Sequence, residues 1–281
     1  AYGASIEVTP PQVWQSTLSS GIDIAGISND EVPLVAFEIK LDGGMLLDPA
    51  GKAGTVNLLA ELLLKGTATK TPKQLEQEIQ LLGATLQTNA SETAVTISGS
   101  VLSKHYDALM ALVTEVLLSP RFDEAEFALA KDDVINQIEQ IKANPNAIAT
   151  AEFKALLYGN AHPFAQTPLG EKESVTAIRL DDVKAFYRNN ISPSLAKFHV
   201  VGDIEPSAVK QALVTLNSAW VPKKVSLPNV SEPSLPETSQ LFFYDVPDAK
   251  QSVLYFGHAG PKATHSDAYL ASVMNYRLGG G

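Results

Sequence analysis

The sequence contains no cysteine among its 281 residues. Disulfide bonds and thiolate-ligated metal sites are therefore excluded. This composition suits either the cytoplasm or a secreted protein that avoids disulfides. Long hydrophobic runs are lacking too, because the longest ones, such as residues 62–64, fall far short of the ~20 apolar residues of a transmembrane helix. We therefore expect no membrane span.

A cluster of basic residues is also missing. Acidic residues outnumber basic residues 31 to 21, and the formal net charge is −10. Lysine and arginine form no block that could neutralise phosphate groups. Nucleic acid and anionic membrane surfaces are therefore poor partners for this chain.

What the sequence does contain is typical of a globular protein, with 45% apolar and 19% charged residues. An apolar helix over residues 53–65 ends at Gly66, and Thr71 and Pro72 begin a second helix. Because strands and helices come in groups, the order predicts an α+β fold with a mixed or antiparallel sheet flanked by helices. The other main elements predicted are strands at 13–18, 22–27, 35–41, 84–88, 94–101 and 198–201, and helices at 103–118 and 123–141.

Composition divides the chain into three parts. Residues 1–220 are predicted to form one domain, and residues 221–238 are a proline-rich stretch typical of a semi-rigid linker. Residues 239–281 repeat the opening order of strand, strand and helix, which predicts the N-terminal part of a second, similar domain. Its predicted strands are 241–246 and 253–257, and its predicted helix is 266–278. Both ends of the chain are expected to have been cut from a longer protein.

Several short motifs follow one another along the whole chain. They are residues 54–67, 82–84 with 89–90, 119–122, 158–164 with 169–170, 200–203 and 275–281. This ordered series resembles the pitrilysin/insulinase family of zinc metallopeptidases, in particular its mitochondrial-processing-peptidase type. The first motif resembles the signature helix of the family, and the last resembles the glycine loop of its second domain. The resemblance implies a sandwich of sheet and helices.

The resemblance also implies where a zinc site would lie. Active members carry His-x-x-Glu-His on the signature helix, where two histidines bind zinc and the glutamate acts as general base. A glutamate on a later helix completes the site. The alignment puts Asn57, Ala60 and Glu61 at the three motif positions and Gln137 at the later glutamate. Since all four have changed, we expect no metal and no catalytic residue in this chain.

The local pattern leaves a simpler alternative open. Asn57, Glu61 and Lys65 recur every fourth residue and form the polar stripe of an otherwise apolar helix. Gln137 interrupts an apolar stripe on the later helix. On spacing alone, these are a solvated helix face and a helix border. None of the five histidines pairs with another at metal-binding spacing on a helix, and His162 is expected to be structural.

One binding feature is expected to survive the loss of the metal. In active relatives an extended peptide adds to an edge strand of the sheet through backbone hydrogen bonds, which need little from side chains. The matching strand covers residues 84–90, with Thr88, Asn89 and Ala90 nearest the degenerate site. The equally weighted alternative is an edge that a helix or the next domain merely covers.

The resemblance therefore predicts a non-catalytic lobe or subunit of a bacterial zinc peptidase. Such a lobe encloses and binds unfolded peptides, while a partner lobe or subunit that carries the zinc cleaves them. The alternative is a structural, non-proteolytic subunit of an assembly. An active peptidase would need ligands that the sequence lacks. The periplasm or cell envelope is favoured over the cytoplasm, and the substrate-binding Arg and Tyr of the family's second domain would follow residue 281.

Overall fold

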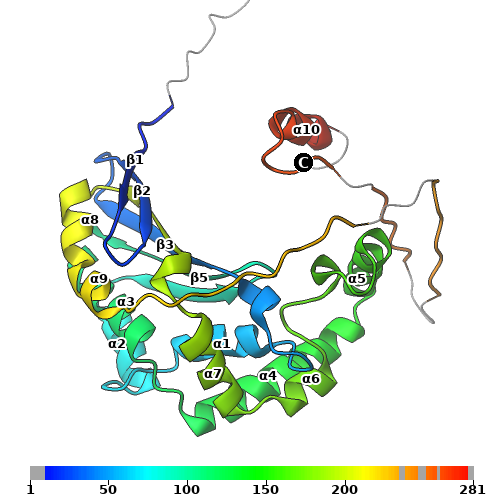
Figure 1. Cartoon of the computed structure of the whole chain (residues 1–281), viewed down its shortest axis with the longest axis horizontal. Coiled ribbons are helices and arrows are strands. Elements are labelled where there is room, and N and C mark those ends of the chain that lie inside the picture. The colour runs from blue at the N-terminus through cyan, green and yellow to red at the C-terminus, as the bar shows by residue number, and fades with distance from the viewer. Residues whose placement is uncertain (1–9, 234–237, 246–250, 258–259, 278–281) are drawn as a thin grey trace, which may run out of the picture. The chain divides into compact units, whose positions relative to one another are not determined.

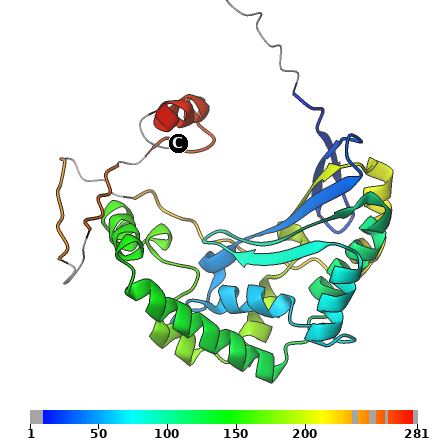
Figure 2. The same ribbon diagram turned by 180° about the vertical axis from the view of Figure 1, so that it is seen from behind.

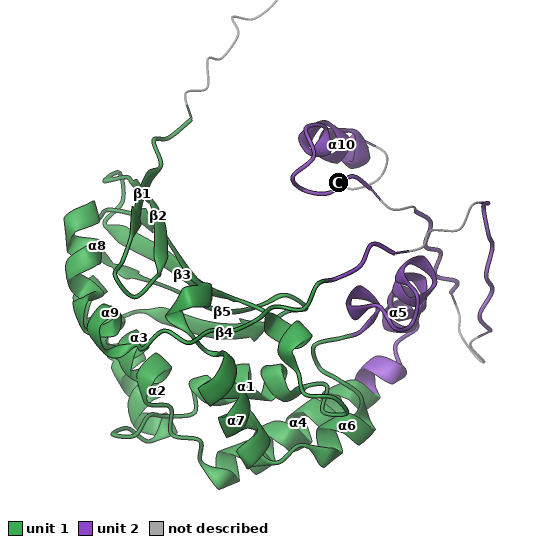
Figure 3. Cartoon of the chain, in the orientation of Figure 1, with its two compact units in different colours: residues 1–139, 167–229 green, residues 140–166, 230–281 purple. Residues whose placement is uncertain are grey.

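The structure is a computed structural model that describes residues 10–233, 238–245, 251–257 and 260–277. The chain divides into two units, one of residues 1–139 and 167–229 and the other of residues 140–166 and 230–281 (Figure 3). The predicted boundaries at 220 and 238 stay a prediction. No helix in the described ranges is both long and apolar enough to cross a membrane.

The first unit is built on one six-stranded sheet (Figure 1). Its strands are β1 (Trp14–Thr17), β2 (Asp23–Ser28), β3 (Leu34–Asp42), β4 (Thr85–Ala90), β5 (Ala94–Leu102) and β6 (Ala196–Gly202). The spatial order is β1-β2-β6-β3-β5-β4. Only β2 and β6 run parallel, while the other neighbours are antiparallel. The predicted mixed sheet flanked by helices is thus confirmed.

Alternation of side chains gives this sheet one buried face. In β3, Val35, Phe37 and Ile39 are buried, whereas the residues between them are at least partly exposed. This period of two is what a strand with one covered face requires. On β6, Lys197 and His199 point to the exposed face. The sheet therefore presents its apolar face to the helices and a polar face to solvent.

Helices cover the apolar face of the sheet. Those of the first unit are α1 (Thr55–Leu63), α2 (Pro72–Leu81), α3 (Tyr106–Leu118), α4 (Glu124–Lys142, which continues into the second unit), α6 (Lys172–Ala177), α7 (Leu180–Asn190), α8 (Pro206–Ala212) and α9 (Val214–Ala219). Short 3-10 turns are η1 (Gly44–Leu47), η2 (Ser103–His105) and η4 (Pro193–Leu195). Helices α1, α3, α4 and α7 lie on one side of the sheet (Figures 1 and 2).

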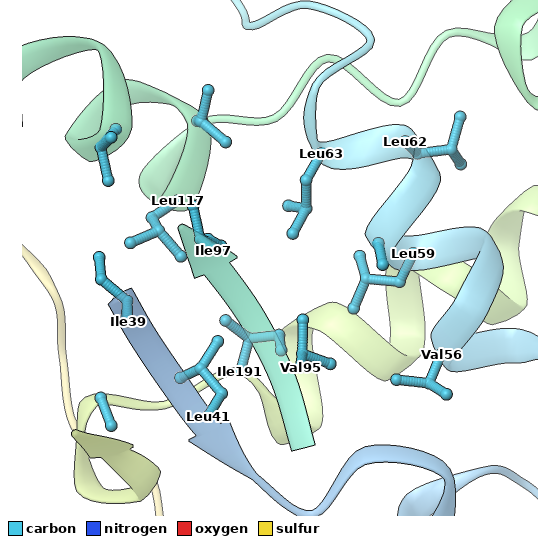
Figure 4. Close-up of a cluster of buried hydrophobic side chains, with 14 of the residues drawn as sticks. Ile39, Leu41, Val56, Leu59, Leu62, Leu63, Val95, Ile97, Leu117 and Ile191 are labelled. Carbon is cyan, nitrogen blue, oxygen red and sulfur yellow. The ribbon is translucent and has the colours of Figure 1, made fainter. Parts of the chain in front are cut away.

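Helix α1 lies in the middle of the core. Leu59 and Leu63 project from it toward Val95 and Ile97 of β5 (Figure 4), and all four side chains are buried. Fully burying one such side chain contributes about 1.5–3 kcal/mol. The nearly all-apolar sequence of α1 is explained by this position, because most of its surface meets other elements rather than water.

The second unit contains α5 (Pro145–Tyr158), η3 (Pro163–Ala165) and α10 (Ala268–Asn275). The predicted helix at 266–278 is confirmed over residues 268–275, the bounds of α10; residues 266 and 267 form a turn, and residue 278 lies outside the described residues. The predicted strands at 241–246 and 253–257 are wrong over 241–245 and 253–257, where no strand forms; residue 246 lies outside the described residues. Two short strands that pair only with each other bury too little surface to persist.

Candidate functional site

Asp48 and Gly54 position the N-terminus of α1. Gly54 adopts φ 101°, and a Cβ atom there would meet the Leu169 carbonyl oxygen at 2.7 Å. Asp48 accepts hydrogen bonds from the backbone N–H groups of Gly54 and Val56, both at 2.8 Å. Burial raises the pKa of Asp48 to about 7, although these bonds favour the charged form. The carboxyl group satisfies backbone donors that helix formation leaves free.

The three predicted motif positions on α1 have different surroundings. Ala60 is only 3% exposed, and its carbonyl oxygen accepts a hydrogen bond from the Thr88 hydroxyl at 2.7 Å. Asn57 is half-buried, and its Nδ2 atom has no hydrogen-bond partner in the part of the chain that the structure describes. Glu61 is exposed. A buried methyl group thus stands between a half-buried amide and a solvated carboxylate.

Gln137 is exposed on α4. Because the alignment places Gln137 at the glutamate that completes the zinc site, it predicts that the Gln137 side chain lies beside that of Asn57, at hydrogen-bonding or one-water distance. The unpartnered Nδ2 of Asn57 shows that it does not donate directly to Gln137. The closeness of the two side chains stays a prediction.

The chemistry of these side chains does not fit a zinc ion. Zinc in proteins takes Cys, His, Asp and Glu ligands, usually four in tetrahedral geometry. Of Asn57, Ala60, Glu61 and Gln137, only Glu61 belongs to that class, and Ala60 can accept no proton. Across the described ranges, no three His, Asp or Glu residues form a metal-binding cluster. These four positions therefore do not supply the donor set of a zinc site.

Strand β4 forms one end of the sheet and pairs only with β5 among the described strands. Thr88 and Ala90 are half-buried toward the helices, whereas Asn89 is exposed. The bond from Thr88 to Ala60 fixes this part of β4 on α1. The predicted binding residues therefore lie on the outermost strand and are tied to the helix that carries the predicted motif positions.

The sequence did not predict the pocket beside this strand. It has a volume of about 470 Å³ and lies between α2, the end of α1 and the first half of β4. Leu64, Ile79 and Leu86 are its half-buried apolar lining residues, and exposed Glu76 lines it as well. In the sequence, Leu64, Ile79 and Leu86 resemble ordinary core residues. No sequence signal therefore distinguished them as the lining of a pocket.

A polar network fixes the loop that follows α1. Thr67 and Thr69 donate their hydroxyl hydrogens to Glu115 of α3, and the Lys70 ammonium lies 2.8 Å from the same carboxylate. Burial alone would raise the pKa of Glu115, but the bond from Lys70 and the two hydroxyl bonds outweigh it and lower the pKa to about 2. Glu115 is thus ionised at neutral pH and serves the fold.

Both ring nitrogens of His162, in the second unit, take part in hydrogen bonds. Nδ1 accepts from the backbone N–H of Phe164 at 3.1 Å, so the proton resides on Nε2, which donates to the Ser231 carbonyl oxygen at 3.0 Å. The ring stacks on Tyr158, with centroids 5.2 Å apart. These contacts fit the structural role expected for this histidine.

Two protein-family models match the chain. The model of insulinase (peptidase family M16) matches residues 24–167, and the model of the peptidase M16 inactive domain matches residues 177–281. Together they cover most of both units. The predicted motif positions lie within the range of the insulinase model, and the inactive-domain model matches the later part of the chain.

Two similar proteins and one solved structure illustrate the relationship. A probable mitochondrial-processing peptidase subunit beta of Arabidopsis thaliana is 22% identical over 97% of this chain and 51% of its own length. A protein of Helicobacter pylori described as a non-peptidase homolog is 25% identical over 90% of this chain and 58% of its own length. A peptidase M16 inactive domain from Pseudomonas fluorescens superposes with a TM-score of 0.73 at 24% identity, covering 79% of this chain and 54% of that one. At that identity the superposition establishes the fold alone. The chain spans about half to three fifths of the length of these relatives.

Proposed function

Because the chain belongs to the insulinase family (peptidase family M16), we propose that it is a non-catalytic lobe or subunit of an insulinase-type zinc metallopeptidase. The observation that carries the proposal is Ala60. By the motif alignment, a buried methyl group stands where active members project their general base.

The proposed role is to enclose and bind unfolded peptides for cleavage elsewhere. Strand β4 is the element suited to it, because its outer edge is paired with no other strand among the described residues. An extended peptide can add there as a further strand, with Thr88, Asn89 and Ala90 in contact with it. Binding of this kind uses the backbone, so it does not require the lost metal ligands.

Cleavage then requires a partner. We propose that a second lobe or subunit of the same family, with an intact His-x-x-Glu-His motif, holds the zinc and the general base. This chain would hold no zinc itself, because its donor set is of the wrong class. The periplasm or cell envelope is the compartment that we assign to the pair, and cell fractionation tests that assignment.

A second candidate function is a structural subunit that binds no peptide. One observation favours it: the similar protein of Helicobacter pylori is described as a non-peptidase homolog. The two functions differ in what the chain does with an unfolded polypeptide. A structural subunit gains nothing from binding one, whereas a substrate-binding lobe must do so.

Peptide binding by the isolated chain tests the proposal. Fluorescence anisotropy of a labelled, permanently unfolded casein fragment should rise with added chain and saturate. The control is a labelled folded protein of similar size, which offers no extended backbone and should leave the anisotropy unchanged. The absence of binding to the unfolded fragment would favour the structural subunit.

A further inference from the structure

The sheet of the first unit has a second outermost strand, β1, at the end opposite β4. It pairs only with β2 among the described strands, so one of its edges has no strand beside it. Proteins usually protect such an edge from pairing with another chain by means of lysine, proline or a bulge. Residues 13–18 contain no charged residue and no proline, and β1 pairs with β2 residue by residue, without a bulge. The edge of β1 is therefore unprotected.

The hydrogen bonding of β1 shows which of its backbone groups are directed to that edge. The N–H group of Leu18 donates to the carbonyl oxygen of Ile22, which leads into β2, at 2.9 Å. Because successive residues of an antiparallel strand direct their backbone groups to opposite sides, Ser16 faces β2 as well. Gln15 and Thr17 then direct their N–H and C=O groups away from β2. These groups are the donors and acceptors for a further strand.

Three contacts hold β1 in place, although it is only four residues long. The Trp14 indole lies against Gly26, where a Cβ atom would come within 2.2 Å of the ring. The Thr17 hydroxyl donates to Asp23 of β2 at 2.8 Å. In the turn after β1, a backbone N–H group donates to the Asn217 side chain of α9 at 2.9 Å. Since the edge is already ordered, pairing with it costs little further conformational entropy.

The residues of β1 match those of a second copy in one antiparallel register. In this register Ser16 lies opposite Ser16 of the second copy. Gln15 then lies opposite Thr17, and both side chains are polar and exposed. Trp14 lies opposite Leu18, and both side chains are half-buried and pack against the core. Paired side chains point to the same face of a sheet, so polar groups meet on one face and apolar groups on the other. A shift by two residues would instead place Trp14 opposite Ser16.

We propose that two copies of this chain associate through β1, paired antiparallel about a two-fold axis at Ser16. The pairing joins the two six-stranded sheets into one continuous sheet. A two-fold contact closes on itself, so it produces dimers and no longer assemblies. This dimer does not depend on the proposed peptide binding, because β4 lies at the opposite end of the sheet and takes no part in the pairing.

The absence of cysteine from the chain allows a covalent test of this pairing. S16C places a single thiol at the two-fold axis, where directly opposed Cβ atoms are about 4.5–5.5 Å apart, close to the reach of a disulfide. Q15C is the matched control, because Gln15 is the more exposed residue but would be diagonal to its copy at about 7–8 Å. Under mild oxidation of the full chain, S16C should form the disulfide-linked dimer roughly tenfold faster than Q15C, since only its geometry permits the bond.

Q15P and Q15A test the backbone pairing without a thiol. Proline at this position removes an N–H group that points away from β2, and edge strands tolerate proline there. A contact between two short strands is small and typical of a weak complex, so sedimentation velocity is measured up to the highest soluble concentration. The wild-type chain and Q15A should shift from monomer to dimer as concentration rises, whereas Q15P should stay monomeric.

Thermal unfolding shows whether Q15P is folded, and if it is not, the two cysteine variants decide the matter alone. A wild-type chain that stays monomeric at every concentration would overturn the proposed dimer. Cross-linking of Q15C as fast as that of S16C would overturn it as well, because random collision favours the more exposed thiol. Dimers that folded Q15P leaves intact would show that the copies associate through another surface.

Discussion

At the scale of single residues, the proposed loss of the zinc site depends on four side chains. Ala60 is buried and Asn57 is half-buried, whereas Glu61 and Gln137 are exposed. The exposed positions can change at little cost, since surface substitutions usually alter stability by less than about 0.5 kcal/mol. A ligand set could therefore be rebuilt without disturbing the core, provided that Ala60 is left alone.

The first prediction concerns zinc. The triple variant N57H/E61H/Q137E should hold about one zinc per chain after dialysis without chelator, because it restores two imidazoles and a carboxylate to one site. The wild-type chain should hold far less. Metal analysis by mass spectrometry measures both, and E61H/Q137E, which lacks one imidazole, is the control. Stoichiometric zinc in the wild-type chain, or no gain in the triple variant, would show the alignment to be wrong.

The second prediction concerns the pH dependence of stability. Burial raises the folded-state pKa of Asp48 from 3.8 to about 7. Between these values the folded state binds more protons than the unfolded state, so the contribution of Asp48 to the free energy of unfolding falls as pH rises from about 4 to 7. Each unit of pKa difference corresponds to about 1.4 kcal/mol.

Urea unfolding of wild type and D48N at pH 4.5, 6 and 7.5, values within and just above this window, measures the effect. The difference in unfolding free energy between the two proteins should shift in favour of D48N as pH rises, because asparagine stays neutral. A shift in favour of wild type would mean that the bonds from Gly54 and Val56 outweigh burial and hold the carboxylate ionised.

At the scale of elements, sequence patterns predicted the long, periodic helices and strands. They did not predict the very short helices or the pairing of strands that are distant in sequence. The apolar run at 53–65 predicted α1, and alternation at 35–41 predicted β3. The short helices α8 and α9 went unpredicted, because each is too short to show a helical period. The parallel pairing of β2 with β6 joins segments that are far apart in sequence, which no local pattern encodes.

The candidate site was likewise predictable in part from the sequence. Residue types at Asn57, Ala60 and Glu61 follow from the motif, but their separate exposures depend on how α1 is rotated in the core. The strands wrongly predicted at 241–245 and 253–257 show the converse, in which a clear local pattern does not lead to the predicted element. Their aromatic and β-branched residues favour strands locally, but a strand also needs a partner to pair with.

The third prediction tests how β4 is attached to α1. T88V removes the hydroxyl that donates to the Ala60 carbonyl oxygen. The free energy of unfolding should fall by about 1 kcal/mol, because the acceptor loses its partner. T88S keeps the hydroxyl and is the control. Urea unfolding measures both variants, and a free energy of unfolding of T88V equal to that of the wild-type chain would show that the bond to Ala60 does not stabilise the fold.

At the scale of the whole molecule, the second unit exposes large apolar side chains. Leu241 is 90% exposed, Phe243 is 88% exposed and Phe256 is 86% exposed. Apolar surface of this kind usually marks an interaction site. We expect another chain or chain segment to pack on it, and the zinc-bearing partner of the proposed function is one protein that would do so.

The central claim is that this chain binds peptide for a partner that cleaves it. The most direct test measures hydrolysis of a quenched fluorescent, unfolded peptide by a zinc-bearing family member from the same genome, with and without this chain. We predict no hydrolysis by the chain alone, and a lower KM or higher kcat when both are present. Hydrolysis by the chain alone, or identical KM and kcat with and without it, would contradict the account.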